Sequence, residues 1–375
     1  MTPSRTKELV IQRHLTNTLL QAPVLPPMAR SPKDLGVEHP TRPLEADVVE
    51  AVASALHGGQ THYVDVPGMP RLRELLAGWL QSMGIRAYTA DHVLVTAGVQ
   101  EARFLSIQVV GDLMGGIALP DVVHPGVLKA AGVRGLRVHR LPTEEGRGFL
   151  PTLPGIQEAL ANGVRLLYLE SPVRLTGAAF DAASVREIAR LLEEHDAAAI
   201  WDQGLAPWAE ECPFLAAEPN MGERTVVLGE AWPGAGLESM LLGYLAARPE
   251  WLEKMRSQKQ VISICTSTPS QLAGIEVAGR YPEVRAEQFG AMARLRQWAV
   301  EQARNLSLEP LPGATVNLLA LRLREDGRAK ARLQTKGLEV AWGEDFGAPG
   351  ILRLAMTSER ALAEAFAALG EATTV

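Results

Sequence analysis

Short apolar runs alternate with amphipathic stretches from about residue 90 to residue 246. The apolar runs are HVLVTAG (residues 92–98), GGIALPD, GLRVHRLP, VRLLYLESP, AAAIWDQ, TVVLGEA and LLGYLAA. Runs of this length that are apolar on both faces and separated by helical segments predict parallel strands covered by helices. The chain is therefore expected to be an α/β protein with a three-layer α/β/α core and a mostly parallel sheet.

One connecting segment shows a helical period directly. After Asp181, one face carries Val185, Ile188, Leu191 and Leu192. Charged side chains take the opposite face, so this segment is predicted to be a surface crossover helix.

The pattern changes after Ala246. Residues 250–305 form a polar, arginine-rich helical region that suits a helix bridging two domains. The remaining runs, ATVNLLALRL, GLEVAWGEDF, GILRLAMTS and ERALAEAFAAL, are typical of a small α+β unit. We therefore expect a large α/β domain at 46–265, and a connecting helix with a small C-terminal α+β domain at 266–375. The proline-rich residues 1–45 are expected to pack on the small domain or on a partner subunit.

Composition and charge exclude several classes of function. The chain of 375 residues is 47% hydrophobic and 21% charged, with a net charge of −6. It lacks both a dense Lys/Arg block for nucleic acid and an apolar window long enough to cross a membrane. No secretory h-region is present, so a cytoplasmic location is expected. Cys212 and Cys265 have no metal-ligand spacing, so neither a metal site nor a disulfide is predicted.

Candidate chemistry lies just after the predicted strands, where open α/β sheets bind ligands. Gly98, Val99 and Gln100 form a small-residue turn that opens a helix, which is either an anion site or a steric requirement of the turn. Asp202 ends a strongly apolar strand, so it either caps a turn or meets a cationic ligand group. Arg174 is either solvated or clamps a carboxylate.

Six motifs in the same order resemble class I/II aminotransferases, pyridoxal-phosphate (PLP) enzymes of fold type I. They are YVDVPGMPRLRELLAGWL, VLVTAGVQEA, GD with LPDVVHPG, SPVRLTG, IWDQGLAPW and EDFGAPGILRLAMTS. The resemblance extends from Tyr63 to Leu369, nearly the whole chain. It implies the fold type I architecture, an amino-acid substrate and a place in amino-acid metabolism.

The resemblance also implies roles for individual residues. Asp202 would pair with the pyridine nitrogen of PLP, and Gly98, Val99 and Gln100 would lie at its phosphate. Arg353 would bind the substrate carboxylate through a bidentate pair. Tyr63 would approach the phosphate from the other subunit, so a homodimer is implied.

The sequence departs from the family where the Schiff-base lysine belongs. The family pattern Ser-x-Ser-Lys followed by Gly-Leu-Arg-x-Gly falls on GEAWPGAGLESMLLGY. Trp232 stands at the lysine, and Gly229, Ala231 and Leu241 replace the two serines and the arginine. The lysines of the chain all lie elsewhere: Lys7, Lys33, Lys129, Lys254, Lys259, Lys330 and Lys336.

Other expected cofactor contacts are also replaced. Arg174 stands for the asparagine beside the ring oxygen, Leu205 for the tyrosine that bonds this oxygen, and His124 for the aromatic residue that stacks on the ring. These changes remove several separate sources of PLP affinity.

Two hypotheses follow from these departures. In the first, the chain is an aminotransferase or related lyase that holds PLP noncovalently and takes its base from His124 or from a partner chain; ordinary transamination would then be slow. In the second, it is a small-molecule binding or regulatory protein without PLP, in which Arg174 and Arg353 attract a carboxylate ligand.

In the second hypothesis a tryptophan supplies a flat apolar wall, the candidates being Trp201, Trp208 and Trp232. Structural roles stay open beside both hypotheses. Arg353 can form an ion pair, Trp232 can belong to the core, and His124 can be an ordinary loop residue.

Overall fold

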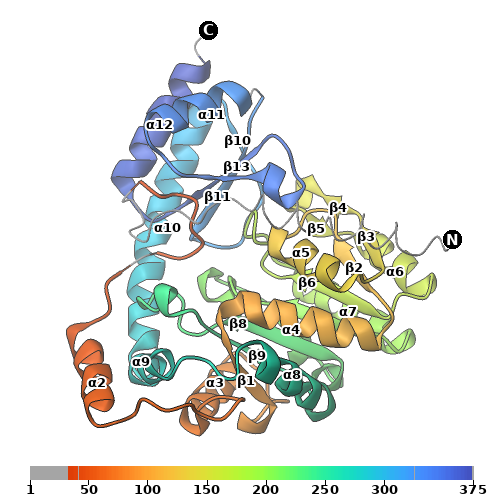
Figure 1. Ribbon diagram of the computed structural model, residues 1–375. Helices are drawn as coiled ribbons and strands as arrows, with labels where there is room; N and C mark the ends of the chain where they lie inside the picture. Colours follow the sequence, from red (N-terminus) through yellow and green to blue (C-terminus); the bar gives the residue numbers. More distant parts are fainter. Residues whose placement is uncertain (1–32, 41, 325, 374–375) are drawn as a thin grey trace, which may run out of the picture.

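The computed structural model describes residues 33–40, 42–324 and 326–373 (Figure 1). Two β-sheets organise this part of the chain. A seven-stranded sheet has the order β1-β9-β8-β7-β6-β2-β3. Its strands are β1 (Val93–Ala97), β2 (Ile117–Pro120), β3 (Val138–Leu141), β6 (Leu166–Glu170), β7 (Ala198–Asp202), β8 (Thr225–Glu230) and β9 (Leu242–Ala246).

The seven-stranded sheet is mostly parallel, as the apolar runs predict. Only β9 runs against its two neighbours, β1 and β8. Alternate residues of the strands face opposite sides; for example, Leu94 packs in one apolar cluster, whereas Val93 and Val95 pack in another. Strands buried on both faces require an apolar side chain at nearly every position, which explains the continuous runs in the sequence.

Helices cover both faces of this sheet and complete the three predicted layers. One face carries α4 (Gly98–Leu113), α5 (Pro125–Arg134) and α8 (Pro249–Ile262). The other face carries α2 (Ala46–His57), α3 (Pro70–Ser82), α6 (Leu153–Ala161), α7 (Ala182–Glu194) and α9 (Thr268–Ala278). The crossover helix predicted after Asp181 is α7, and the Asp181 side chain caps it by accepting a hydrogen bond from Ser184 N.

The second sheet has four antiparallel strands in the order β10-β11-β13-β12. Its strands are β10 (Glu309–Pro310), β11 (Leu318–Arg322), β12 (Ala341–Trp342) and β13 (Ile351–Ala355). It packs with α10 (Tyr281–Asn305), α11 (Asp326–Thr335) and α12 (Glu359–Thr373). Figure 1 shows α10 running from the larger sheet's helices up to this smaller unit.

The long helical region predicted at 250–305 is divided into α8, α9 and α10. Pro269 and Pro282 lie in the first turns of α9 and α10, where proline is tolerated because these N–H groups have no partner within the helix. No helix in the described residues is long and apolar enough to cross a membrane.

The remaining elements are short. β4 (Thr143–Glu144) and β5 (Leu150–Pro151) form a two-stranded hairpin. Single 3₁₀ turns lie at Ala90–His92, Glu145–Arg147, Ala206–Trp208, Leu215–Ala217, Met221–Glu223, Glu238–Met240 and Gly343–Phe346.

The described part of the N-terminal segment packs on the four-stranded unit. Leu35 N donates to Glu339 O at 2.7 Å, and Leu35 O accepts from Ala355 N at 2.9 Å. Leu35 and Val37 are buried in the apolar cluster of that unit. These contacts hold the following residues, Glu38 and His39, beside the ends of the large sheet. Residues 1–32 lie outside the described part of the chain.

Two glycines allow a close approach between β9 and the start of α4. A Cβ atom on Gly243 would lie 2.5 Å from the carbonyl carbon of Gly98. Gly98 itself has a φ of +72°, a backbone conformation that glycine adopts without a steric penalty. This junction forms one wall of the cleft described below.

Gly243→Ala is expected to lower the free energy of unfolding by about 1–3 kcal/mol, because the added methyl group overpacks this junction. Gly132→Ala is the control: Gly132 lies on exposed α5 with no atom within 4 Å of an added Cβ, so the change should stabilise the protein by about 0.5–1 kcal/mol. Urea unfolding measures both. Equal effects of the two changes would contradict the close packing at Gly243.

Candidate functional site

A cleft of about 470 Å³ lies at the carboxyl ends of the parallel strands. Its walls come from the start of α4, the loop after β2, the end of β8, the loop before β9, the Phe346 turn, β13 and the N-terminal segment. Three adjacent parallel strands each end in an acidic residue, namely Glu170 on β6, Asp202 on β7 and Glu230 on β8. The pairing of β6 with β7 and of β7 with β8 brings these carboxylates to one edge of the sheet.

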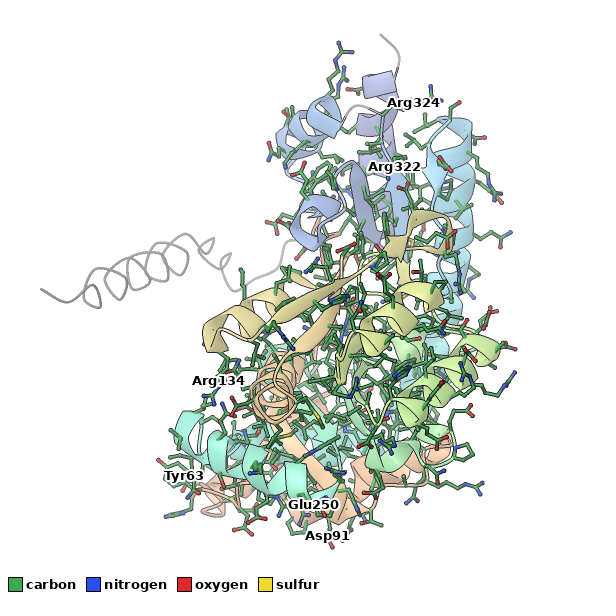
Figure 2. The ribbon with its side chains drawn as sticks, turned by 90° about the vertical axis from the view of Figure 1, so that its right-hand side faces the viewer. Tyr63, Asp91, Arg134, Glu250, Arg322 and Arg324 are labelled. Carbon is green, nitrogen blue, oxygen red and sulfur yellow. The ribbon has the colours of Figure 1, made fainter. Side chains whose placement is uncertain are left out.

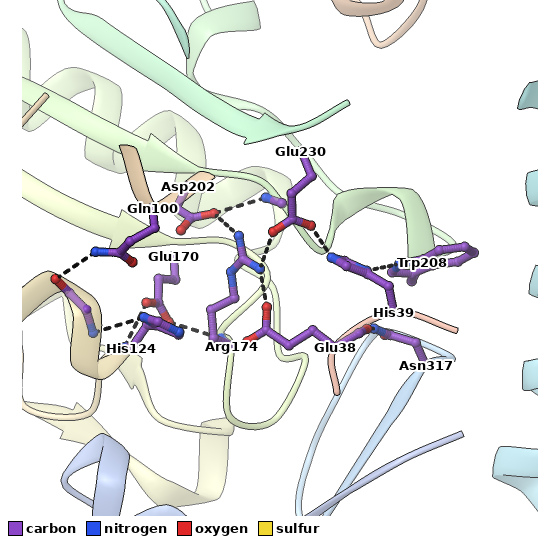
Figure 3. Close-up of polar contacts among 12 residues, drawn as sticks. Glu38, His39, Gln100, His124, Glu170, Arg174, Asp202, Trp208, Glu230 and Asn317 are labelled. Atoms are coloured by element: carbon purple, nitrogen blue, oxygen red, sulfur yellow. Dashed lines mark hydrogen bonds and ion pairs between the residues drawn. The ribbon is translucent and has the colours of Figure 1, made fainter. Parts of the chain in front are cut away.

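Asp202 is fully buried, and both of its carboxylate oxygens accept hydrogen bonds; Figure 3 shows the one from Arg174. Oδ1 accepts from Arg174 Nη2 at 2.7 Å and from Gly204 N at 3.0 Å. Oδ2 accepts from Arg103 Nε at 2.9 Å, Arg103 Nη2 at 2.8 Å and the Tyr168 hydroxyl at 2.8 Å. Burial opposes ionisation, but Arg174 and Arg103 hold the pKa of the Asp202 carboxyl below its usual value.

Arg103 is a site residue that sequence reasoning missed. It lies on α4 and is 2% exposed. Besides Asp202, its Nη1 contacts Gln100 Oε1 at 3.2 Å and His124 Nδ1 at 3.3 Å. The guanidinium therefore fills the space between Asp202 and His124. Burial opposes its charge, but Asp202 raises the pKa of Arg103, so the arginine stays cationic.

Arg174, predicted in the loop after β6, is fully buried and joins three carboxylates. It bonds Asp202, contacts the carboxylate of Glu38, and lies 3.4 Å from Glu230 Oε1. Burial opposes its charge, but Asp202 and Glu38 raise the pKa of Arg174. Of the two alternatives for Arg174, the solvated side chain is therefore wrong: the guanidinium is buried and binds carboxylates of the chain itself.

Arg353, predicted on the C-terminal motif, reaches the same cluster from β13. Its Nη1 donates to Glu38 Oε1 at 3.2 Å and to Arg174 O at 2.8 Å, and its Nη2 donates to Gly36 O at 2.6 Å. Its buried Nε has no hydrogen-bond partner among the described residues. Burial lowers the pKa of Arg353, which Glu38 partly offsets. Burial also opposes ionisation of Glu38, but Arg174 and Arg353 hold the pKa of Glu38 well below its usual value.

His39 Nε2 contacts the carboxylate of Glu230 beside this cluster. Trp208 Nε1 donates to His39 Nδ1 at 2.8 Å, so Nδ1 must keep its lone pair and Nε2 carries the hydrogen toward Glu230. Burial opposes the charged ring, whereas Glu230 raises the pKa of His39. If both ring nitrogens of His39 were protonated, the Nδ1–H group would face the N–H group of Trp208. The neutral ring, with its hydrogen on Nε2, satisfies the contacts with both Trp208 and Glu230.

Glu38, His39 and Glu230 also carry the types of ligand atom that bind metal ions. Within the described residues, ligand atoms of Glu38, His39 and Glu230 lie within 4.8 Å of one another. Nε2 of His39 would have to give up its proton, and Nδ1 would then need a proton that Trp208 opposes. Arg174 also contacts both carboxylates. This chemistry does not suit a divalent cation.

His124 and Glu170 line the opposite side of the cluster. His124 Nδ1 accepts from Gly126 N at 3.1 Å as well as from Arg103. Burial and then Arg103 lower the pKa of His124 to about 3, which makes it a weak general base near neutral pH. Glu170 accepts from the backbone N–H groups of His124 and Arg174, yet burial and then Asp202 raise its pKa to about 7.

Trp232 occupies the predicted lysine position as a packed aromatic residue. Its side chain is 3% exposed, and Nε1 donates to Gly274 O at 2.8 Å. Its ring packs against Trp79 and Tyr281 and also contributes to the cleft wall. Of the three tryptophans considered as that wall, it alone lines the cleft within the described residues: Trp201 and Trp208 are buried elsewhere in the core.

The predicted anion turn lines the cleft, but the start of α4 carries its own carboxylate. Gly98, Val99 and Gln100 lie in the cleft wall. Glu101 accepts from Ala97 N at 2.6 Å and from Lys259 Nζ at 2.7 Å. Lys259 is fully buried and held by this ion pair, so its amine does not serve the cleft.

Tyr63, the residue implied to act across a subunit interface, points away from the body of the protein (Figure 2). Its side chain is 70% exposed and contacts the ring of His62. It does not line the cleft of its own chain in the described residues. Its role in a partner's cleft stays a prediction.

The fold and the cleft position are those of an α/β protein that binds ligands at the carboxyl ends of its strands, and comparison with known proteins identifies the family. The family model "Aminotransferase class I and II" matches residues 34–369. The aspartate/prephenate aminotransferase of Thermus thermophilus is 28% identical over 85% of both chains. The arginine–pyruvate transaminase of Pseudomonas aeruginosa is 26% identical over 86% of this chain and 84% of its own.

Solved structures give the same fold. A mutant Thermus thermophilus aspartate aminotransferase matches with a TM-score of 0.82 and 24% identity, over 92% of this chain and 97% of its own. The aromatic aminotransferase of Pyrococcus horikoshii matches with a TM-score of 0.83 and 22% identity, over 90% and 95% of the two chains. The chain therefore belongs to the class I and II aminotransferase family and has the fold type I architecture.

The residues present do not fit the cofactor that the family implies. Asp202 has no lone pair left for a pyridine nitrogen, because Arg103, Arg174, Tyr168 and Gly204 use both oxygens. Trp232 supplies no amine. Leu241, at the position of the phosphate arginine, offers an aliphatic side chain to the cleft.

Arg103→Met is expected to lower the free energy of unfolding by about 3–5 kcal/mol, because it leaves a buried carboxylate with one cationic partner fewer. Arg190→Met is the matched control. Arg190 pairs with Glu187 and Glu194 while 54% exposed, and its loss should change the free energy of unfolding far less than the loss of Arg103 does. Urea unfolding separates the two. Similar losses would show that the Asp202 cluster is no more coupled than a surface pair.

His124 should make stability pH-dependent. Its lowered pKa means that the unfolded chain takes up a proton that the folded chain refuses. Stability should therefore fall as pH drops from about 6.5 toward 3, by at most about 1.4 kcal/mol per pH unit. Glu170, whose pKa is raised, acts in the opposite sense between about 4.5 and 7.

Urea unfolding at several pH values, compared with His124→Gln, isolates the histidine because both proteins keep Glu170. The difference in unfolding free energy between wild type and variant should change steadily below pH 6.5, to the disadvantage of wild type. The exposed His57→Gln is the control. A pH-independent difference for His124→Gln would show that His124 protonates freely in the folded protein.

Proposed function

We propose that this family member is a small-molecule binding protein that uses the cleft for an amino acid or similar small carboxylate, without PLP and without transamination. The main support is that both carboxylate oxygens of Asp202 already accept hydrogen bonds from groups within the chain. Arg103 and Arg174 hold it from two sides. A cationic ring nitrogen would have to displace an arginine from a fully buried ion pair, which costs several kcal/mol.

No lysine of the described residues lines the cleft, and this supports the loss of transamination. Trp232 is buried at the Schiff-base position, and the buried Lys259 is paired with Glu101. His124 is a poor replacement for the proton-transferring base, because burial and Arg103 lower its pKa to about 3. The first of the two sequence hypotheses, in which His124 acts as the base, therefore has the weaker support.

A small carboxylate is supported by the walls of the cleft. Arg353 lines the cleft, and its buried Nε has no hydrogen-bond partner among the described residues. Leu237, Leu242, Phe346 and Trp232 add apolar surface. A cleft of about 470 Å³ that combines apolar walls with convergent polar groups is typical of a small-ligand site. The names of relatives, such as the arginine–pyruvate transaminase of Pseudomonas aeruginosa, agree with an amino-acid-sized ligand.

We also propose a cytoplasmic homodimer. The homodimer is supported by exposed apolar side chains on neighbouring helices: Leu113, Leu128, Val133, Val261 and Ile262. A groove between α4 and α8 includes part of this surface. Burying these side chains against a second copy would remove them from water.

Titration with PLP, followed in the near-ultraviolet and visible range, tests the proposal. We expect no saturable binding and no borohydride-reducible adduct on any lysine. Trp232→Lys should also fail to form an internal aldimine, because Arg103 and Arg174 still hold Asp202. The same variant should lose about 3–5 kcal/mol of stability by removing a buried aromatic residue.

A PLP-dependent aminotransferase carried through the same titration is the positive control. Tight PLP binding by the wild-type protein would reject the proposal. A reducible adduct mapped to one lysine would also reject it and would identify the missing nucleophile.

A further inference from the structure

Glu38 holds the position at Arg353 that a ligand carboxylate would take. It comes from the N-terminal segment, outside both sheets, and its side chain is 18% exposed at the cleft wall. Its carboxylate touches Arg353 and Arg174. A ligand carboxylate that binds Arg353 therefore competes with Glu38 for this guanidinium.

The cleft has balanced charges before any ligand enters. Arg103, Arg174 and Arg353 face three carboxylates with lowered pKa, on Asp202, Glu38 and Glu230. Glu170 and Glu238 are acids, so they cannot compensate an added negative charge. Burial raises the pKa of both. A bare anion would thus add a negative charge to this cluster, and it would leave the displaced Glu38 carboxylate with Arg174 as its remaining cationic partner in a poorly solvated place.

A zwitterion avoids this imbalance. Its carboxylate takes the place of the Glu38 carboxylate at Arg353, and its ammonium group pairs with the displaced Glu38. Glu230 is available as a second acceptor, because its Oε1 has only a weak contact with Arg174 at 3.4 Å. Both acidic residues border the cleft.

We propose that Glu38 is the specificity-determining residue of this cleft: it exchanges Arg353 for the ligand's ammonium group and so selects amino acids over the corresponding 2-oxo acids. The inference rests on the proposed function and deepens it. Leu237, Leu242, Phe346 and Trp232 form the apolar part of the wall, which suits an amino acid with an apolar side chain.

The buried arginine supports a ligand as well as an internal ion pair. Arg353 is 3% exposed, and its Nε has no acceptor among the described residues. A buried donor without a partner is costly. Glu38 contacts only Nη1 of this guanidinium, at 3.2 Å, so a carboxylate that made two hydrogen bonds to the guanidinium would satisfy more donors than Glu38 does.

Isothermal titration calorimetry of the full chain tests the inference with matched probes. The probes are L-leucine and L-phenylalanine, each with its 2-oxo acid and its decarboxylated amine. For one or both of these amino acids, the wild-type protein should bind the amino acid at least tenfold more tightly than it binds the corresponding oxo acid or amine. Only the zwitterion both occupies Arg353 and pairs with Glu38.

Glu38→Gln removes the charge but keeps the shape. It should bind the oxo acid at least tenfold more tightly than wild type does, and the amino acid more weakly, so that the selectivity shrinks or reverses. Glu38→Asp keeps the charge and should retain the preference for the amino acid. Glu145→Gln, which removes a carboxylate paired with Arg322 outside the cleft, is the matched control and should leave the selectivity unchanged.

Each result decides a different question. Equal affinity of wild type for the amino acid and its oxo acid would overturn the inference and leave the proposed function intact. Unchanged selectivity in Glu38→Gln would also overturn it. No binding of any probe to wild type or Glu38→Gln would reject the inference together with the proposed carboxylate site. The wild-type selectivity is informative even where a variant does not fold.

Discussion

The Asp202 carboxylate between Arg103 and Arg174 is the interaction on which the site depends. All three side chains are buried to 98% or more, and isolated charges in such a place are very unfavourable. They are tolerated because each meets an opposite charge at hydrogen-bond distance. The same arginines fix the surroundings, since Arg103 contacts Gln100 and His124 while Arg174 contacts Glu38 and Glu230.

This ion pair connects two departures that the sequence presents separately. A buried carboxylate at the end of β7 needs a cation, and the family's cofactor would supply one at its ring nitrogen. Here Arg103 supplies that charge from within the chain. With the charge of Asp202 already compensated, the cleft no longer needs PLP for its electrostatic balance. The packed Trp232, bonded to Gly274 O, is then compatible with a stable fold.

The sequence predicts the strands and the strand-end residues well, because apolar periodicity and position after a strand are local signals. Asp202 and Arg174 were found in this way, whereas Trp232 was found through the resemblance to the aminotransferase family. Arg103 was missed because an arginine on a helix usually faces solvent, and its partner Asp202 is 99 residues away. Glu38 and His39 lie in a proline-rich segment without periodicity, so only the folded chain reveals their contacts. The acidic ends of LLYLE and TVVLGE were a local signal for Glu170 and Glu230.

The position of Glu38 also joins the two sheets. Arg353 belongs to the four-stranded sheet, and Arg174 follows a strand of the seven-stranded sheet. The Glu38 carboxylate contacts Arg174 (Figure 3) and also Arg353, and the backbone carbonyl of Glu38 accepts from Asn317 Nδ2. A ligand that takes Glu38 away from Arg353 therefore changes a contact that holds the two units together. Ligand recognition and the relative placement of the sheets act on the same carboxylate, so a change in one must alter the free energy of the other.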